Sequence, residues 1–407
     1  VTATTTVVIQ KTAPLAQAPA GFSWDIAATW AQAPLDGSGL WPDVAQPDTS
    51  GYRDTTDDGK GTVTANCEHF PNEQHQNAFD NAGAKWCAKQ AEVQIDYSYA
   101  DNRREKIVAY TITSANDAPG RDPRDWQLLG SNDGKAWTVV DTRKGESFFD
   151  RYFKRLFKVQ KPGEYAMYRL QVLSNGGDVS TQLDEIELLV PGEPQKQYSA
   201  DDIAKALAST EGYKPLFADD LSNAIFPAGI WTVEDGVITA SEDQALWSKE
   251  LYQNFVVSLE FKTAPHTNSG VMVYCTDTGN WIPNSVEIQI ADDHDADWEK
   301  PPTSWQCGVI FGHLPASSKR VKKPGEWNQC AVAAVGPMIT VQLNGEVVTV
   351  MDMREWTSGT KNPDGSDIPA WLNRPKASMA TRGHIGFQGK HAGAPIYFRN
   401  IRVRTLD

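Results

Sequence analysis

The chain has 407 residues, of which 40% are hydrophobic, and a formal net charge of −14 at pH 7. This length predicts two or three domains, and the apolar content is sufficient for packed cores, which excludes a disordered protein. The negative charge without a block of Lys and Arg argues against a nucleic-acid partner, because phosphate binding needs clustered positive charge. No apolar run is long enough to span a membrane. We expect a monomer without a membrane span.

Residues 1–58 are rich in Ala, Thr, Pro, Asp and Gly, and we expect an N-terminal extension or a small β segment there. The next region, 59–190, contains short β-type runs separated by turn signals such as Asn132-Asp133-Gly134. The predicted strands are 91–97, 107–113, 126–131, 137–141, 154–159, 165–173 and 183–190. Strands at this spacing are typical of an antiparallel β-sandwich.

A polar segment with Pro and Gly opens the predicted linker, 191–212, which includes a short amphipathic helix at 200–209 that Ser199 or Asp201 could cap. The β pattern then resumes in the last region, 213–407. Its predicted strands are 237–240, 255–263, 270–275, 286–290, 308–311, 330–335, 338–343 and 347–351. Asn344-Gly345 between two of these strands predicts a tight hairpin. The predicted fold class is all-β, with two antiparallel β-sandwiches.

The strand at 286–290 offers the first candidate for chemistry. Side chains alternate between the two faces of a strand, so Val286, Ile288 and Ile290 should face the core, and Glu287 and Gln289 the other side. Retaining glycosidases need two carboxylates about 5–5.5 Å apart and inverting ones about 6.5–9.5 Å. The strand carries one acid only, which disfavours an ordinary two-carboxylate glycosidase unless a loop supplies the second acid.

Further polar and aromatic candidates lie near the end of the chain and after the Glu287 strand. Gln388 and His391 sit where a strand runs into a glycine-rich turn at 383–393. The acidic loop 292–299 could contribute a metal ligand or a second acid through Asp292 or His294, although a solvated loop is the usual role of such a run. Trp298 and Trp305 are candidates for the wall of a sugar pocket.

The first region carries a group of motifs that belong together. They are Asn77-Ala78-Phe79-Asp80-Asn81, Lys85-Trp86, residues 121–137, Tyr168-Arg169-Leu170 and residues 183–188. On these motifs the region 59–190 resembles a discoidin-type (coagulation factor 5/8 C-type) module. The resemblance implies a galactose-binding-like jelly roll, often carbohydrate-binding, with a structural calcium ion whose side-chain ligands would be Asp80 and Glu185. Oxygen ligands suit such a hard cation.

A second group of motifs spans residues 213–405. They are Asn268-Ser269-Gly270-Val271, Glu287-Ile288-Gln289-Ile290, Gly325-Glu326-Trp327-Asn328, Leu343-Asn344-Gly345, and residues 383–388 through 398–401. On these motifs the region resembles the 3-keto-disaccharide hydrolase family. The resemblance implies a concanavalin-like jelly roll in an exported bacterial protein, periplasmic, secreted or on the cell surface. It also implies cleavage of glycosides that carry a ketone at sugar carbon 3, and a substrate-binding role for Asn268 and Ser269.

The implied reaction is consistent with a single acid on the strand. A ketone at carbon 3 acidifies the proton on carbon 2, and its removal gives an enolate that expels the group on carbon 1 before water adds. This route needs one base and a stabiliser of the enolate oxygen. Glu287 suits the base or a metal ligand, since a divalent cation could act as electrophile. Gln289 and Gln388 suit hydroxyl recognition, and His391 suits acid/base work or metal ligation.

The expected function is therefore an enzyme that cleaves 3-keto-glucosides or 3-keto-disaccharides, with carbohydrate as its partner. Two alternatives stay open at this point. One is a non-catalytic glycan-binding protein made of two jelly rolls, and the other is a conventional β-sandwich glycosidase. A carboxylate with a histidine favours chemistry, whereas aromatic platforms with neutral amides favour binding.

Overall fold

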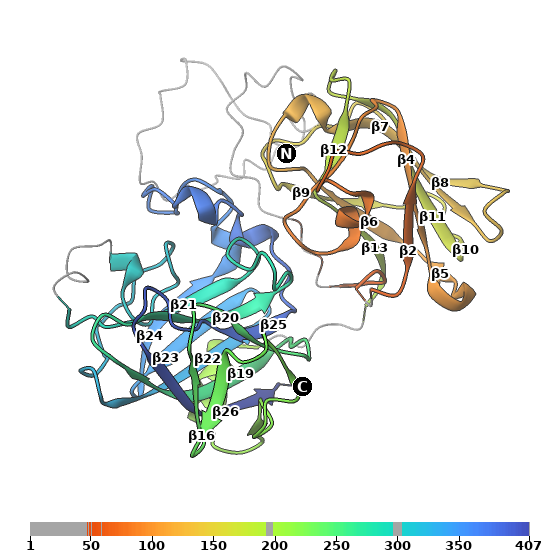
Figure 1. The fold of residues 1–407 in the computed structure, drawn as a ribbon. Helices are drawn as coiled ribbons and strands as arrows, with labels where there is room; N and C mark the ends of the chain where they lie inside the picture. Colours follow the sequence, from red (N-terminus) through yellow and green to blue (C-terminus); the bar gives the residue numbers. More distant parts are fainter. Residues whose placement is uncertain are drawn as a thin grey trace, which may run out of the picture.

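The structure is a computed structural model that describes residues 47, 49, 51–57, 59–192, 198–295 and 303–406. Figure 1 shows two β-sandwiches, one formed by the first half of the described chain and one by the second. All strand pairs with a printed register are antiparallel, which confirms the predicted all-β class of two antiparallel sandwiches. None of the helices in the described part of the chain is long and apolar enough to cross a membrane.

The first sandwich has two main sheets. One contains, in spatial order, β1 (Tyr52–Asp54), β13 (Glu185–Pro191), β6 (Ala109–Thr113) and β9 (Lys154–Lys158). The other contains β2 (Thr62–Ala65), β4 (Val93–Ser98), β11 (Met167–Asn175), β7 (Pro123–Ser131) and β8 (Thr138–Arg143). Two small ribbons pair β10 (Glu164–Tyr165) with β5 (Glu105–Lys106), and β12 (Thr181–Leu183) with β3 (Trp86–Ala88).

Alternation of buried side chains forms the core of the first sandwich. Along β4, Val93, Ile95 and Tyr97 are buried and the residues between them are not. These side chains join a core cluster with Tyr110 of the opposite sheet. Burial of such apolar surface stabilises the fold by about 25 cal/mol per Å².

The second sandwich pairs a back sheet with a front sheet. The back sheet contains β16 (Trp231–Glu234), β17 (Val237–Ala240), β26 (Ile396–Thr405), β19 (Phe255–Thr263), β22 (Trp327–Val335), β23 (Met338–Leu343) and β24 (Glu346–Asp352), with β14 (Lys214–Pro215) also on β26. The front sheet contains β15 (Ala224–Ile225), β18 (Leu246–Ser248), β25 (His384–Phe387), β20 (Asn268–Cys275) and β21 (Val286–Ala291). One core cluster contains side chains of both sheets.

Several local predictions can be compared directly with the structure. The helix α2 (Ala200–Ala208) forms, and Ser199 rather than Asp201 is its N-cap, in a capping box with Asp202. Asn344 and Gly345, both with positive φ, join β23 to β24 as predicted. The strand predicted at 308–311 is wrong: only Ile310 forms isolated bridges, one of them to Ile288 of β21.

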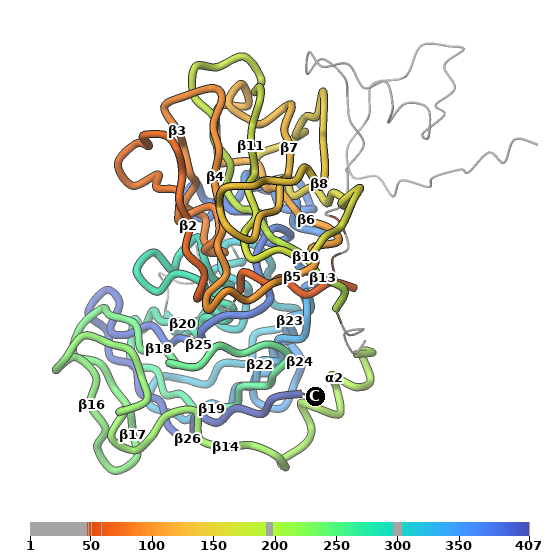
Figure 2. The backbone as a smooth tube through the Cα atoms, turned by 90° about the vertical axis from the view of Figure 1, so that its right-hand side faces the viewer, coloured from red at the N-terminus to blue at the C-terminus, as the bar shows by residue number. Residues whose placement is uncertain are grey.

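Short 3-10 helices connect the strands. They are η1 (His75–Phe79), η2 (Ala100–Asn102), η3 (Pro119–Arg121), η4 (Thr303–Trp305), η5 (Met353–Glu355), η6 (Ala370–Leu372) and η7 (Lys376–Ser378). In the view of Figure 2 the first sandwich lies above the front sheet of the second. The two sandwiches touch where Asn284 and Arg374 of the second meet the loop at residues 81–83 of the first.

Candidate active site

The front sheet turns one face to the core and the other, which we call the site face, away from it. Val286, Ile288 and Ile290 of β21 lie in the core cluster, as the alternation predicts, so Glu287 and Gln289 lie on the site face. The register pairs Met272 with both Glu287 and Gly386. Because β21 is the edge strand of this sheet, Glu287 lies at the end of a row of site-face residues that crosses the sheet through Met272 and Gly386.

Glu287 occupies a place that a glycine leaves open. Its side chain lies across Gly270 of β20, where an added Cβ would overlap the carboxylate oxygen Oε1. Burial raises the pKa of Glu287 to about 8, and the charge of Asp243 adds to this effect while that of Lys376 opposes it. A carboxyl group with such a pKa can take and release a proton near neutral pH.

Lys376 is the cation near Glu287, and sequence reasoning missed it. It starts η7, its side chain is only 2% exposed, and its Nζ donates a hydrogen bond to the carbonyl oxygen of Ser285 (3.0 Å). Burial lowers the pKa of Lys376 to about 7, with a further contribution from Arg374, and Glu287 works in the opposite direction. Perturbed groups of this kind cluster at functional sites.

His313 is a second residue that the sequence did not reveal. Its Nδ1 donates to the carbonyl oxygen of Phe311 (2.7 Å), so Nε2 of the neutral ring is a free acceptor. Within the described part of the chain this buried Nε2 has no hydrogen-bond partner. Burial and the charge of Lys376 lower the pKa of His313 to about 3, which keeps the ring neutral. Neither His313 nor Lys376 lies in a periodic pattern that would have predicted its burial.

The predicted amides lie in the next row of the same face. Gln289 is buried and its Nε2 donates to Oδ1 of Asn268 (2.9 Å). The backbone N–H of Gln388 donates to the carbonyl oxygen of Gly270 (2.9 Å), which places Gln388 beside the glycine under Glu287. Its side-chain Oε1 is buried and unpaired among the described residues. Gln388 therefore offers an unused acceptor next to the Glu287 carboxyl group.

His391 lies at the border of this face. Its backbone bridges Asn268, and its Nδ1 donates to Oδ2 of Asp243 (2.6 Å). Both side chains are largely exposed, at 42% and 47%. The charge of Asp243 contributes to the raised pKa of Glu287. The structure thus links His391 to Glu287 through Asp243 and shows no direct contact between them.

Other predicted substrate-binding residues have structural partners. The Ser269 hydroxyl is buried and donates to the carbonyl oxygen of Gln388 (2.8 Å). The Asp292 carboxylate accepts from the backbone N–H groups of His266 and His294 (3.2 Å each), and Nε2 of His294 donates to the carbonyl oxygen of Val321 (3.1 Å). These contacts hold the loop after β21. Trp298 lies outside the described residues.

Aromatic side chains flank Glu287 on both sides of the row. Trp247 packs with Met272 and Trp281 on one side. On the other side the backbone N–H of Phe311 donates to the carbonyl oxygen of Glu287 (3.0 Å). Phe311 contacts Trp305, which in turn contacts the half-exposed Trp371, with ring centroids 5.4 and 6.4 Å apart. Trp305 is thus the middle member of an aromatic series that extends outward from Glu287.

The donor set around Glu287 does not match a divalent cation. Its neighbours are amides, one imidazole nitrogen and a buried lysine, whereas such cations select several carboxylates or histidines. In the described ranges no group of three or more His, Cys, Asp and Glu side chains could hold a metal ion. We derive no step through a metal at this face.

Asp80 and Glu185 of the first sandwich lie near each other. Oε2 of Glu185 accepts from the N–H of Asn81 (2.6 Å), the residue after Asp80, and the charge of Asp80 raises the pKa of Glu185 after the larger effect of burial. Burial also raises the pKa of Asp184 to about 7, and both its oxygens are buried without hydrogen-bond partners in the described chain. Carboxylate oxygens are the ligands that calcium prefers, although as positioned here these side chains are not among any described group of three or more that could hold a metal ion.

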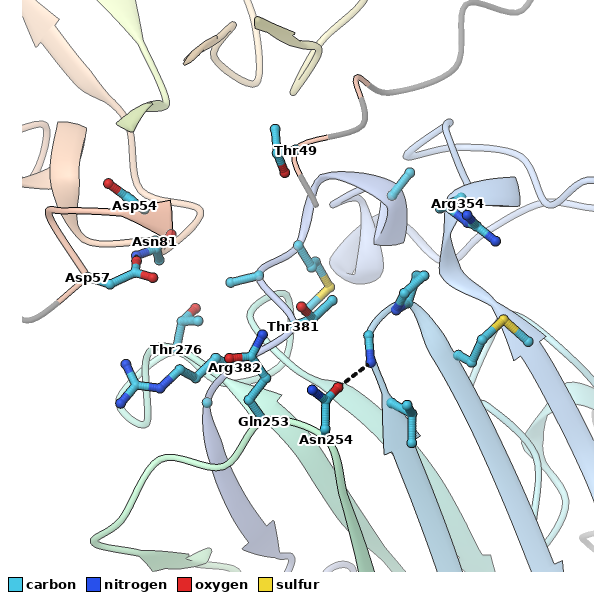
Figure 3. A pocket seen from close by; sticks show the side chains of 18 of the residues that line it. Thr49, Asp54, Asp57, Asn81, Gln253, Asn254, Thr276, Arg354, Thr381 and Arg382 are labelled. Atoms are coloured by element: carbon cyan, nitrogen blue, oxygen red, sulfur yellow. Dashed lines mark hydrogen bonds between the residues drawn. The ribbon is translucent and has the colours of Figure 1, made fainter. Parts of the chain in front are cut away.

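A separate cavity of about 1450 Å³ lies between the sandwiches (Figure 3). Asp54, Asp57 and Asn81 line it from the first sandwich, and Gln253 and Arg382 from the second. Glu287 and the amides of the site face are not among its lining residues. This cavity is therefore distinct from the place where the chemical groups gather.

Comparison with known proteins finds relatives of the second sandwich. Residues 208–404 match the family described as 3-keto-alpha-glucoside-1,2-lyase-like domain. A 3-keto-disaccharide hydrolase of Bacteroides thetaiotaomicron is 24% identical over 211 residues, which are 44% of this chain and 70% of that protein. A candidate glycosyl hydrolase of Parabacteroides distasonis, solved as a crystal structure, is 55% identical with a TM-score of 0.47, covering 48% of this chain and 99% of that chain.

A further relative is a peptide-N(4)-(N-acetyl-beta-glucosaminyl)asparagine amidase of Arabidopsis thaliana, 37% identical over 142 residues, or 31% of this chain. The chain spans only 19% of that protein's length. The family match and the Bacteroides thetaiotaomicron relative indicate that residues 208–404 are glycosyl hydrolase-like.

Proposed function

We propose that this protein cleaves 3-keto-glucosides or 3-keto-disaccharides by removing the proton on carbon 2, expelling the aglycone and adding water. The observation that carries the proposal is the buried Lys376, whose Nζ binds the carbonyl oxygen of Ser285 just before the Glu287 strand and whose charge acts on the pKa of Glu287. A single desolvated carboxyl group beside a buried lysine suits proton abstraction next to a ketone, whereas two opposed carboxylates would suit an ordinary glycosidase. The family match over residues 208–404 supports the same substrate class.

The Glu287 carboxylate takes the proton from carbon 2, and the electron pair of that C–H bond forms an enolate whose negative oxygen is on carbon 3. The Lys376 ammonium group, together with hydrogen-bond donors of the site face, stabilises this oxygen. The enolate then reforms the ketone and its electron pair makes a double bond between carbons 1 and 2, while the bond between carbon 1 and the glycosidic oxygen breaks. The departing oxygen takes a proton from His391, which Asp243 orients. Water finally adds its hydroxyl to carbon 1 and gives its proton to His391, while Glu287 returns its proton to carbon 2.

The surrounding residues are assigned to binding. The unpaired Oε1 of Gln388 and Nε2 of His313 are acceptors for sugar hydroxyls, because a buried acceptor without a partner is costly until a ligand supplies a donor. Trp305 and Trp371 form an apolar platform on one side of Glu287 that suits the aglycone ring. For the first sandwich we propose a discoidin-like module that binds carbohydrate and holds calcium through Asp80 and Glu185; the ion would neutralise that carboxylate cluster. We also propose export of the protein.

The test is incubation with a 3-keto-glucoside and measurement of aglycone release, with the unoxidised glucoside as the control substrate. Loss of a general base typically lowers the rate by about 10²–10⁴-fold, so Glu287→Gln should nearly abolish release. Glu234→Gln changes an exposed strand glutamate of the back sheet in the same way and should keep full activity. If wild-type protein released no aglycone, or if Glu287→Gln matched wild type, the proposal would be wrong.

A non-catalytic glycan-binding protein is one alternative. It predicts that wild-type protein binds the 3-keto-glucoside in a calorimetric titration and releases no aglycone. A conventional β-sandwich glycosidase is the other alternative, and it predicts that the unoxidised control glucoside is cleaved.

A further inference from the structure

The contact between the sandwiches involves Asn284, two residues before the strand that carries Glu287, and Arg374, two residues before Lys376. We propose that the first sandwich acts as a positioning element for this site, because its loop at residues 81–83 holds Arg374 and Asn284 and thereby places Lys376 beside Glu287. The kinetic effects of this inference rest on the proposed function, whereas the placement of Lys376 by the first sandwich does not depend on it.

The contact is small, buried and polar. Nη1 of Arg374 donates to Oδ1 of Asn284 (2.6 Å), and the same oxygen accepts from the N–H of Gly83 in the first sandwich (2.7 Å). The guanidinium group also lies 3.4–3.5 Å from the carbonyl oxygen of Asn81. Asn284 is 0% and Arg374 is 3% exposed. A buried guanidinium loses much free energy unless its neighbours satisfy it, so this loop determines where Arg374 can lie.

The same two segments continue from the interface into the site. Asn284 and Arg374 form the outer pair, which the first sandwich contacts. Ser285 follows Asn284 directly, and Lys376 lies two residues after Arg374. These two residues form the inner pair, in which Nζ of Lys376 donates to the carbonyl oxygen of Ser285 (3.0 Å). Ser285 precedes β21, the strand that carries Glu287. A displacement at the outer pair is therefore transmitted over one or two residues to both groups of the proposed chemistry.

Charge connects the two pairs as well. The groups that face Lys376 are Glu287, the neutral His313 and Arg374, and Arg374 lowers the pKa of Lys376. On the other side the Arg374 guanidinium lies 3.4–3.5 Å from the carbonyl oxygen of Asn81 in the first sandwich. The first sandwich thus supplies an acceptor that helps a second cation to stay buried near the site lysine.

Gly83 gives a mild way to disturb the contact from the first sandwich alone. An added Cβ would lie 3.0 Å from Oδ1 of Asn284 and 3.3 Å from Cδ of Arg374, so Gly83→Ala should push the outer pair apart by a few tenths of an ångström. Gly51→Ala is the matched control, because a Cβ there meets nothing within 4 Å. Arg374→Gln removes the charge, and Arg374→Lys keeps the charge but loses the fork geometry.

The experiment compares these full-length variants in two measurements. The first is the pH profile of kcat/KM for aglycone release from a 3-keto-glucoside. The second, which needs no substrate, is the titration of Lys376 followed by NMR of protein labelled with ¹³C at lysine Cε, with the Lys376 signal assigned by its loss in Lys376→Met. We expect Arg374→Gln to move the pH profile and the Lys376 titration midpoint toward higher pH by about half a unit or more, because Lys376 loses a neighbouring positive charge.

Gly83→Ala should lower kcat/KM several-fold. It should also move the pH profile and the Lys376 titration midpoint toward higher pH, since the displaced Arg374 becomes better solvated. Gly51→Ala should match wild type, and Arg374→Lys should keep the Lys376 titration near its wild-type position. If folded Gly83→Ala and Arg374→Gln keep the wild-type profile and titration, the inference is wrong. If Arg374→Gln does not fold, the result for Gly83→Ala alone tests the inference. Absence of wild-type activity would refute the proposed function alone, because the NMR titration still tests the positioning.

Discussion

The side chain of Glu287 lies across Gly270 on the neighbouring strand, so that any side chain at position 270 would occupy the space of the carboxylate. The relationship follows from the register, which pairs Gly270 with Gln289 and Met272 with Glu287. A glycine here leaves the carboxyl group room to lie against the sheet beside Gln388. The position of the Glu287 carboxylate therefore requires glycine at position 270.

The first prediction concerns this pair. Gly270→Ala should displace the Glu287 carboxylate and lower kcat/KM by about 10- to 100-fold, since misplacement by an ångström has effects of that size. The flexible end of Glu287 can move aside, so thermal unfolding should change little. Kinetics with a 3-keto-glucoside and circular-dichroism melting check both statements. Wild-type kinetics in this variant would mean that the carboxylate position seen here is not the reactive one.

The second prediction concerns pH. Burial raises the pKa of Glu287 to about 8 and lowers that of Lys376 to about 7. The reaction needs the Glu287 carboxylate together with the Lys376 ammonium group, which is one of the two forms in which the pair holds a single proton. Below about pH 7 both groups are protonated and above about pH 8 neither is, so kcat/KM should be bell-shaped with its maximum between these values. Lys376→Met should remove the bell shape and leave a single ionisation.

The third prediction concerns the aromatic series beside Glu287. Trp371 is 54% exposed and contacts Trp305 edge-on, so Trp371→Ala should scarcely affect stability. Loss of one aromatic contact of about 0.5–1.5 kcal/mol predicts a twofold to tenfold fall in kcat/KM. The fall should be larger for a bulky aglycone than for methanol as leaving group. Trp137→Ala in the first sandwich is the control. If the two substitutions lowered kcat/KM equally, the proposed binding of the aglycone by Trp371 would be wrong.

The fourth prediction concerns the carboxylates of the first sandwich. Their folded-state pKa values are raised, to about 6 for Asp80 and about 7 for Asp184, from an ordinary value of 3.8. The protonated folded state is favoured, so this contribution to stability is complete below about pH 4 and is lost as the pH rises through 6 to 7. Without calcium, the melting temperature should therefore fall between pH 5 and 8.

Calcium should reverse that fall if Asp80 and Glu185 bind it, because the ion stabilises the ionised carboxylates. Melting curves in EDTA and in excess CaCl₂ measure the difference. Asp184→Asn should weaken the pH dependence in EDTA, whereas Asp219→Asn, at an exposed position, should not. A melting temperature that changes neither with calcium nor with pH would contradict the proposed role of these carboxylates.

Local patterns in the sequence are enough to predict the β architecture and part of the site. Alternation places Glu287 and Gln289 opposite Val286 and Ile288, and positive φ at Asn344 and Gly345 closes the predicted hairpin. These features depend on neighbours within a few residues, and strand geometry alone decides them. The same reasoning fails for 308–311, where an apolar run forms a single bridge at Ile310 because it lies against the edge of β21.

The sequence by itself thus determined the fold class and the strand face on which Glu287 stands. Only the tertiary structure decided that Lys376, His313 and Gly270 surround it, since these residues come from separate segments that long-range strand pairing brings together. It likewise decided that Ser269 and Asp292 serve hydrogen bonds of the scaffold. Burial is the physical reason: the low-dielectric surroundings that shift the pKa values of Glu287 and Lys376 exist only after the sheets and loops have packed.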